Sequence, residues 1–219
     1  MTARTSYPLS VIIPTRNEEA RIGAAIDSAF AAGAAEVLVC DGGSTDDTLR
    51  VAEEHGARIV ACSPPRGRQL NAGAAAAAHE HLLFLHADTA LPPGAAAAVI
   101  SSNADFGGFP LRFTEPALRL RLAALMINLR TFLTRRPWGD QAQFVRRDRF
   151  PGYREIPIME DYELAARMGP GAILPLYVTT SGRRFLEKGV LRTVLINQRV
   201  IAAWKRGVAP EELARIYRE

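Results

Sequence analysis

Short apolar runs alternate with helix-forming stretches over the first 110 residues, and this alternation limits the possible folds more than any other feature. The apolar runs lie at residues 9–15, 36–41, 58–62 and 81–88. Each contains several consecutive apolar residues without polar alternation, which is typical of parallel strands covered on both faces. The helix-forming stretches between them span residues 21–32, 46–55 and 69–79. We therefore predict an α/β fold with an open, mostly parallel central sheet, flanked by helices and joined by right-handed crossovers.

Glycines and capping residues support these boundaries. Gly33 and Gly56 follow the first two helical stretches, where helix ends favour glycine. Residues 44–47 (STDD) offer capping side chains and first-turn acids just before the second stretch.

The second half of the chain is less regular. After a helix at 94–102, we predict strands at 107–113, 139–147 and 173–180, and helices at 116–133, 160–168, 190–207 and 210–218. No internal repeat or low-complexity linker marks a boundary. We predict one domain over residues 1–219, made of a first half to about 110, a second half to about 185, and a helical tail over 186–219.

Composition indicates a globular protein, with 48% hydrophobic and 23% charged residues. The two cysteines, Cys40 and Cys62, are too few for a disulfide framework and predict reduced thiols. The first ten residues lack the apolar run of a secretory signal, and no apolar stretch is long enough to cross a membrane. We expect a cytoplasmic protein.

Charge is distributed unevenly along the chain. Residues 1–110 carry 7 basic and 12 acidic side chains, and residues 111–219 carry 20 and 11, which gives −5 and +9. Of the 27 basic residues 25 are arginines, whose planar fork suits phosphate binding. A GC-rich genome is an alternative explanation for the arginine excess.

Polar residues follow three of the predicted parallel strands, at residues 14–18, 41–44 and 86–88. Open parallel sheets bind ligands in the crevice beyond the carboxyl ends of their strands. Helix caps and solvated turns would explain any one of these segments. They explain less well why all three lie on one edge of the sheet. We predict a ligand site at this edge.

Six motifs, in this order, carry a family resemblance: SVIIPTRNEE, VLVCDGGSTDDT, GRQLNAGAAAA, LLFLHADT, GDQAQFVRR and IMEDYELAAR. Together they resemble the family 2 glycosyltransferases of the GT-A fold from about residue 9 to 185. The whole chain is similar to a small bacterial subfamily labelled rSAM/selenodomain-associated transferase 2. The resemblance implies an inverting glycosyltransferase that moves a sugar from a nucleotide-sugar donor, of the UDP- or GDP-sugar class, to the hydroxyl of an unknown acceptor.

The resemblance also implies a divalent metal, Mn²⁺ or Mg²⁺, held by Asp88 as the last acid of the family's DXD motif. Such a cation would neutralise the charge that grows on the leaving diphosphate. His86 stands where many relatives have the first acid. It could ligate a softer ion, contact the ribose or be a structural histidine.

The donor-binding residues implied by the resemblance lie in the first half. They are Pro14, Thr15, Asn17, Glu18, Asp41, Ser44, Arg68, Asn71, Ala87 and Asp88. Asp41 resembles the acid that contacts the donor's base, and Arg68 would lie against the diphosphate. Two alternatives stay open: Asp41 caps its own turn with Ser44, and Arg68 is a surface arginine at a helix start.

The acidic pair Glu160 and Asp161 matches the family's ED motif, which supplies the catalytic base, usually its Asp. A carboxylate in that role must reach the acceptor hydroxyl opposite the leaving phosphate. An acidic pair that only complements a helix dipole is the alternative.

Five further residues complete the predicted acceptor or diphosphate side. They are Trp138, Asp140, Gln141, Arg183 and Arg184. A tryptophan beside amide and carboxylate groups suits a sugar platform, or else packs in the core. The two arginines could close over the diphosphate, or be solvated. The QxxRW motif of processive members is missing, which disfavours repeated addition.

Rival functions have weaker support. A nucleotidyltransferase acting on sugar phosphates shares the architecture, but usually carries a GxGTR loop after its first strand. A Rossmann dehydrogenase is disfavoured because the GxGxxG fingerprint is absent after the first predicted strand. A non-catalytic basic module for membranes or nucleic acid would leave Asp41, Asp88 and Asp161 without purpose, and no nucleic-acid motif is present.

Residues 116–136 combine a stripe of large apolar side chains with five arginines at helical spacing. A helix of this kind suits a position in a membrane interface, which predicts weak peripheral binding to anionic lipid. The alternative is that the stripe packs against the sheet or the C-terminal helices, or forms a homodimer contact.

Overall fold

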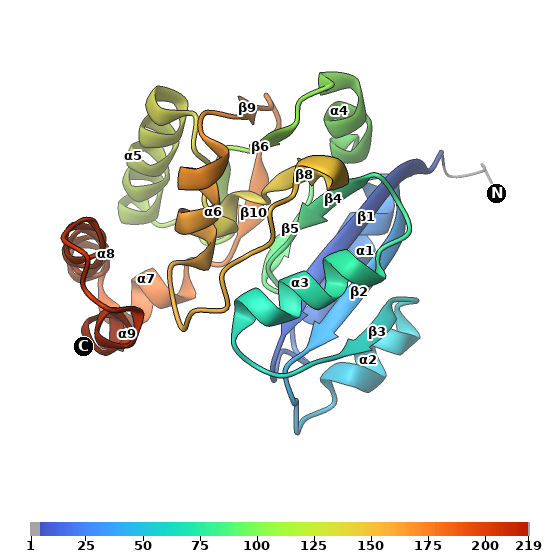
Figure 1. The fold of residues 1–219 in the computed structure, drawn as a ribbon, viewed down its shortest axis with the longest axis horizontal. Helices are drawn as coiled ribbons and strands as arrows, with labels where there is room; N and C mark the ends of the chain where they lie inside the picture. The colour runs from blue at the N-terminus through green and yellow to red at the C-terminus, as the bar shows by residue number, and fades with distance from the viewer. Residues whose placement is uncertain (1–4, 219) are drawn as a thin grey trace.

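The computed structural model describes residues 5–218 of the chain. Its centre is a seven-stranded sheet in the order β3-β2-β1-β4-β8-β6-β9 (Figure 1). The strands are β1 (Tyr7–Thr15), β2 (Ala34–Asp41), β3 (Arg58–Ala61), β4 (His81–Phe84), β6 (Phe106–Gly108), β8 (Phe144–Arg146) and β9 (Ala172–Ile173). The first four pair in parallel, and β8 runs antiparallel between β4 and β6. The predicted α/β architecture with a mostly parallel sheet is confirmed.

Helices cover both faces of this sheet, which explains the continuous apolar runs of its strands. On one face, Leu9, Val11 and Ile13 of β1 pack with α1 (Ile22–Ala31), α2 (Thr48–Glu54) and α4 (Ala95–Ser102). On the other face, Ile12 packs with α3 (Arg66–Ala76) and α6 (Glu160–Met168). Cys40 lies in this second layer, and neither it nor Cys62 forms a disulfide. The three layers are visible in Figure 1, where α3 lies in front of the parallel strands.

Glycines end the first two helical units as predicted. Gly33 and Gly56 have φ of 97° and 81°, a left-handed conformation that side chains with a Cβ adopt at a cost. The turn after each glycine leads directly into β2 or β3.

Three predicted strands are shorter or divided. Residues 107–113 split into β6 and β7 (Leu111–Phe113), and residues 173–180 split into β9 and β10 (Val178–Thr180). In both cases the chain leaves the large sheet for a second sheet of order β5-β10-β7, in which β5 is Thr89–Ala90. Pro110 lies at one crossing, where its missing N–H cannot continue a ladder. Of residues 139–147, only β8 is a strand, because 139–141 form a 3₁₀ turn.

Two helical segments also differ from the prediction. Helix α3 begins at Arg66 rather than at residue 69, and α7 (Arg183–Lys188) is a helix that was not predicted. The strand predicted to reach residue 88 ends at Phe84. Residues 85–88 are therefore loop, in which Leu85 and Ala87 are buried in the core while His86 and Asp88 line a cavity.

The predicted helical tail is present as α8 (Val190–Lys205) and α9 (Pro210–Arg218). These helices pack around a small core of their own, built from Ile196, Val200, Ala203 and Leu213. Ile158 and Met159, just before α6, pack against it. The tail is thereby attached beside the start of α6.

Helix α5 (Leu118–Thr134) contradicts the alternative in which its large apolar stripe packs against the sheet or the C-terminal helices. The face that packs inward is small and partly polar: Leu120, Ala123, Ala124, Asn128 and Thr131. The Asn128 side chain accepts a hydrogen bond from the Leu111 N–H at 2.9 Å and donates one to the Leu111 carbonyl at 2.8 Å. The large apolar side chains point outward instead. No helix within residues 5–218 has the length and apolar character needed to cross a bilayer.

Candidate active site

A cavity of about 450 Å³ lies beyond the carboxyl ends of the parallel strands, between the sheet and the C-terminal helices. One wall is polar and comes from the loop after β4, the 3₁₀ turn and the start of α6: His86, Asp88, Asp140, Glu160 and Asp161. The opposite wall comes from α7, α8 and α9. The predicted position of the site, at the strand ends, agrees with this cavity.

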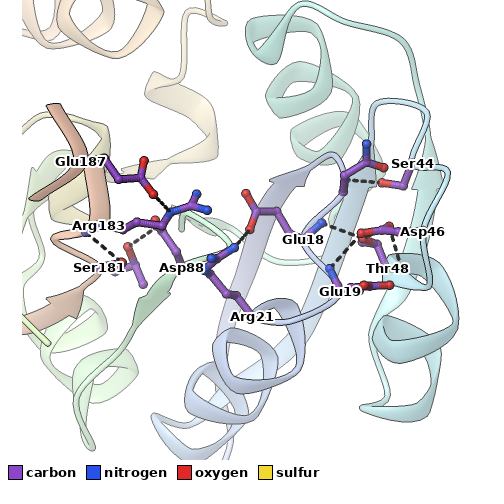
Figure 2. Close-up of polar contacts among 12 residues, drawn as sticks. Glu18, Glu19, Arg21, Ser44, Asp46, Thr48, Asp88, Ser181, Arg183 and Glu187 are labelled. Carbon is purple, nitrogen blue, oxygen red and sulfur yellow. Dashed lines mark hydrogen bonds and ion pairs between the residues drawn. The ribbon is translucent and has the colours of Figure 1, made fainter. Parts of the chain in front are cut away.

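Asp88 lies in the cavity between two groups of charged side chains. Figure 2 shows it between Arg183 on one side and Glu18 with Arg21 on the other. Burial and the Glu18 carboxylate raise the pKa of Asp88, while Arg21 and Arg183 oppose that rise. Its carboxylate accepts one long hydrogen bond, 3.5 Å from Thr89 Oγ1. The oxygens of Asp88 are therefore available to a ligand.

Two backbone N–H groups fix the Asp161 carboxylate in the same cavity. Gly139 donates to Oδ2 at 2.7 Å, and Tyr162 donates to Oδ1 at 2.8 Å. A Cβ at Gly139 would lie 2.9 Å from both Asp161 Oδ2 and His86 Nε2. Glycine at this position thus lets the carboxylate and the imidazole approach the same point.

Glu160, only 3% exposed, forms an ion pair with Arg66 at 3.2 Å. Burial raises the pKa of Glu160, and Arg66 counteracts it. Arg66 was not among the predicted site residues, although it lines the cavity and lies two residues before the predicted Arg68. An earlier helix start would have pointed to this residue. Because α3 begins at Arg66, the side chain of Arg66 lies in the first turn of the helix, at the edge of the sheet.

His86 faces Asp161 across this space and is surrounded by other charges. Burial, together with the nearby Arg66 guanidinium, lowers the pKa of His86 to about 4. The ring is therefore neutral at pH 7, with one nitrogen available as a donor and one as an acceptor.

Asp140 and Trp138 also line the cavity, as predicted. Burial raises the pKa of Asp140 to about 6, and its Oδ1 is buried without a hydrogen-bond partner among the described residues. The Arg130 guanidinium stacks 3.6 Å from the Trp138 ring centre. Tyr162 meets the same ring edge-on at 5.7 Å. The indole is thus held by packing on one side and borders the cavity on the other.

The two predicted arginines of α7 lie in the opposite wall. Arg183 is 3.9 Å from Glu187, one helical turn away. The Arg184 guanidinium stacks 3.7 Å above the ring of Tyr217 from α9. Burial and the positive charge of Arg66 lower the pKa of Arg184. Arg66, Arg183 and Arg184 therefore converge on one cavity, where an anionic ligand would be stabilised.

The predicted base-binding residues do not line this cavity, but lie at the ends of β1 and β2 or in the turns that follow these strands. In the β1–β2 register, Thr15 lies opposite Asp41, which brings the two strand ends together. The Asp41 carboxylate accepts hydrogen bonds from the Gly43 and Ser44 N–H groups and from Ser44 Oγ at 2.5 Å. The Asn17 N–H donates to Ser44 Oγ, which joins the two turns. The turn-capping alternative for Asp41 is thus realised in the structure.

The remaining predicted residues have different surroundings. Pro14 borders a small cavity of about 10 Å³ shared with His86 and Asp161, whereas Glu18 pairs with Arg21 at 3.0 Å. Arg68 points away from the main cavity to Glu155, at 2.8 Å. The others are engaged as follows: Asn71 bonds the backbone of Tyr153, Gln141 accepts from Arg130, Thr131 and Trp138, and Ala87 is buried.

A divalent cation fits the donor set at Asp88. Among residues 5–218, no group of three or more His, Cys, Asp or Glu side chains could hold an ion without other ligands. Mg²⁺-type cations commonly use one or two carboxylates and take their other ligands from water and phosphate. A single, partly buried carboxylate with available oxygens, facing arginines that suit a diphosphate, matches that requirement.

Comparison with known proteins agrees with this geometry. Residues 10–105 match the family model for glycosyl transferase family 2. A stretch of 53 residues is 47% identical to 4,4′-diaponeurosporenoate glycosyltransferase of Staphylococcus aureus. That stretch is 24% of this chain and 14% of the relative, so the two proteins are comparable only over a short segment.

Solved structures are similar over most of the chain. Glucosyl-3-phosphoglycerate synthase from Mycobacterium tuberculosis, in complex with Mn²⁺ and UDP-glucose, superposes with a TM-score of 0.54 at 25% identity, over 81% of this chain and 70% of the synthase. S. aureus TarS superposes with a TM-score of 0.62 at 19% identity, over 86% of this chain and 39% of TarS. The second likeness concerns the fold alone.

The narrower resemblance to one bacterial subfamily stays a prediction. The family model covers the strand ends that carry Asp41 and Asp88, and the fold places both at the edge that holds the cavity. On this evidence residues 10–105 are similar to glycosyl transferase family 2, and the chain shares the fold of the mycobacterial synthase.

Proposed function

We propose that the chain transfers a sugar from a nucleotide-sugar donor to an acceptor hydroxyl. One observation carries the proposal: a single cavity brings together Asp88, Asp161 and three arginines at the carboxyl edge of the sheet. The family match supports it, as does the Mn²⁺ and UDP-glucose complex of the mycobacterial synthase. Within the predicted UDP- or GDP-sugar class, the UDP-glucose complex of that synthase supports a UDP-sugar donor.

The donor would lie along the edge from β2 toward the cavity. Its nucleoside would rest on the rim formed by Asp41, Asn17 and Ser44, and its diphosphate would reach Asp88 and Arg183. Asp88 would hold the divalent cation. When bound, the cation would neutralise the negative charge that develops on the leaving nucleoside diphosphate. Arg66, Arg183 and Arg184 add positive charge from this chain.

Asp161 is the proposed base. Its carboxylate takes the proton of the acceptor hydroxyl while the acceptor oxygen forms a bond to the anomeric carbon and the bond to the diphosphate oxygen breaks. The electron pair of the broken bond leaves with the nucleoside diphosphate. Because one displacement occurs from the opposite side, the product has the inverted anomeric configuration.

The preorganised surroundings of Asp161 suit this role. Two backbone N–H groups orient the carboxylate, so little reorganisation is needed when the acceptor binds. Glu160 is directed to Arg66 instead, and we assign it a positioning role at the start of α6.

The wall of the cavity that faces the carboxylates combines charged and apolar side chains. Phe113, Phe185, Val200 and Ile201 provide apolar surface beside the arginines of α7. An acceptor that fits both walls presents a hydroxyl to Asp161 and an apolar portion to α7 and α8. We expect alkyl glycosides to be better acceptors than free sugars with the same head group.

A thermal-shift screen followed by a transfer assay tests the proposal. The chain is heated with UDP, GDP, CDP and dTDP sugars in the presence of Mn²⁺ or Mg²⁺. A ligand at 100 times its dissociation constant adds about 2.7 kcal/mol to the free energy of unfolding. Release of nucleoside diphosphate with an acceptor supports transfer, whereas no shift and no release with any donor contradicts it.

The same assay separates the rival functions. A nucleotidyltransferase would release pyrophosphate from a nucleoside triphosphate and a sugar phosphate. A non-catalytic module would release neither product. A cytoplasmic place of action stays a prediction.

A further inference from the structure

Seven large apolar side chains of α5 project from the surface. They are Leu118, Leu122, Leu125, Met126, Leu129, Phe132 and Leu133, and each is about half exposed or more. At 3.6 residues per turn they fall within an arc of about 120° on one side of the helix. Contiguous exposed apolar surface of this kind marks an interaction site on a folded protein.

Helix α8, which contacts α5, also carries exposed apolar side chains. They are Leu191, Val194 and Leu195, near the start of the helix. In Figure 1 both helices lie at the end of the molecule away from α2 and β3. We call the ten exposed apolar residues of α5 and α8 the apolar face.

The two segments that carry the apolar face contain charges of one sign only. Residues 118–136 and 190–207 contain no Asp or Glu, and they contain eight arginines and one lysine besides the apolar residues. At about 100° per residue, Arg119 and Arg121 fall on opposite edges of the α5 arc. Both arginines are exposed. An apolar strip with basic borders is the pattern of helices that lie in a membrane interface.

We propose that the apolar face docks on the surface of an anionic lipid bilayer. The leucines would enter the boundary between head groups and acyl chains, and the bordering arginines would meet lipid phosphates. None of the described helices could span the bilayer, so the helices would lie along it.

A second copy of this chain is the alternative partner for the apolar face, and the charge of the face disfavours it. A symmetric dimer places the same patch against itself, which would bring the basic borders together without an acid from either helix to compensate them. An anionic bilayer compensates the charge on both edges.

The position of α8 connects this surface to the cavity. Thr193, Asn197 and Val200 on its inner side line the cavity, whereas Leu191 and Leu195 lie on its outer side. Docking would therefore bring the acceptor wall of the cavity near the head groups. The docking itself does not depend on the proposed transfer reaction, so each can fail without the other.

Vesicle sedimentation tests the docking directly. The chain is mixed at low ionic strength with phosphatidylcholine vesicles, or with vesicles of phosphatidylcholine and phosphatidylglycerol in equal parts, and the pellet is quantified. We expect pelleting with the anionic vesicles alone, and release by salt. Equal recovery in the supernatant with both vesicles would overturn the proposal.

Matched variants make the test specific. In Leu122→Glu/Leu129→Glu, two exposed side chains of the apolar face become acidic, and we expect the vesicle partition coefficient to fall at least about tenfold. The control Ala24→Glu/Ala75→Glu adds the same charge at exposed positions of α1 and α3 and should pellet like the wild type. An equal loss in the control contradicts a specific face.

Light scattering after size-exclusion chromatography measures whether the chain self-associates through the apolar face. A wild-type dimer that becomes a monomer in Leu122→Glu/Leu129→Glu, with no vesicle binding by either protein, would assign the face to a second copy and overturn the proposal. A wild-type monomer that pellets with anionic vesicles supports it.

Discussion

Asp161 is the residue on which the proposed chemistry depends most. We expect Asp161→Asn to reduce transfer by about 10²–10⁴-fold, because the amide cannot take the acceptor proton. Donor affinity should change little, since the role proposed for this side chain is on the acceptor hydroxyl. The measurement pairs turnover with donor titration.

A stability control is needed for that variant. The amide nitrogen of asparagine would face one of the two N–H groups that now donate to the carboxylate. A thermal midpoint near that of the wild type excludes unfolding as the cause. Turnover like that of the wild type would remove Asp161 from the mechanism.

Asp88 is expected to act on the donor instead. Asp88→Ala should weaken donor binding in the presence of Mn²⁺ or Mg²⁺ and leave it unchanged in the presence of a chelator. Titration of both proteins with and without chelator measures this. Equal donor affinity in all four experiments would be incompatible with a metal at Asp88.

Gly139 lies against both Asp161 and His86, and the structure has no room for a methyl group at its Cα. In Gly139→Ala the new Cβ would lie 2.9 Å from an atom of each side chain, so one of them must move. We expect kcat to fall by about 10²-fold, as misplacement of a catalytic group by about 1 Å commonly does.

The matched control for that variant is Gly23→Ala. Its Cβ would lie 2.7 Å from His55 Nε2, a comparable clash on α1. We expect a loss of stability without a loss of turnover per folded molecule. Similar kcat losses in both variants would show that Gly139 has no special place in the site.

At the scale of elements, the Arg66–Glu160 ion pair joins the first turn of α3 to the first turn of α6. Arg66→Met leaves the buried Glu160 carboxylate without its partner. Because Arg66 is half exposed, we expect a decrease of about 1–3 kcal/mol in the free energy of unfolding, less than for a fully buried pair.

Two further variants test whether the pairing is the cause. Arg66→Met/Glu160→Gln should recover most of the loss, because no buried charge is left unpaired. Arg68→Met, in the same helix, breaks the exposed pair with Glu155 and two exposed hydrogen bonds, to Ser63 and Pro64, and should cost at most about 1 kcal/mol. Urea denaturation of the four proteins measures these differences, and equal losses for Arg66 and Arg68 would contradict the assignment.

At the scale of the whole molecule, the buried Asp140 makes stability depend on pH. Its pKa is about 6 in the folded chain, against an ordinary value of 3.8. Between these values the unfolded chain has lost the proton that the folded chain keeps, so stability falls as pH rises. The groups whose charges act on it are Arg130, Asp161 and Asp88.

Asp140→Asn should remove this dependence. Relative to the variant, the wild type should lose up to about 3 kcal/mol of unfolding free energy between pH 4 and pH 7. Urea denaturation across this range measures both proteins. Parallel stability curves would show that Asp140 ionises normally.

Much of the fold follows from the sequence alone. The apolar runs of β1 to β4 require cover on both faces, and Gly33 and Gly56 mark helix ends, because these signals act within a few residues. The strand-end acids Asp41 and Asp88 predicted the edge where the site lies, since parallel strands end together.

Tertiary structure decided what local pattern leaves undetermined. Arg66 rather than Arg68 faces the cavity because α3 starts earlier and because Glu160, far along the chain, pairs with it. Residues 107–113 divide between two sheets because their strand partners come from distant segments. The spacing of α5 predicted an apolar face, but helical periodicity does not say which side meets the core. Packing against Leu111 through Asn128 turned the small side chains inward and left the leucines at the surface.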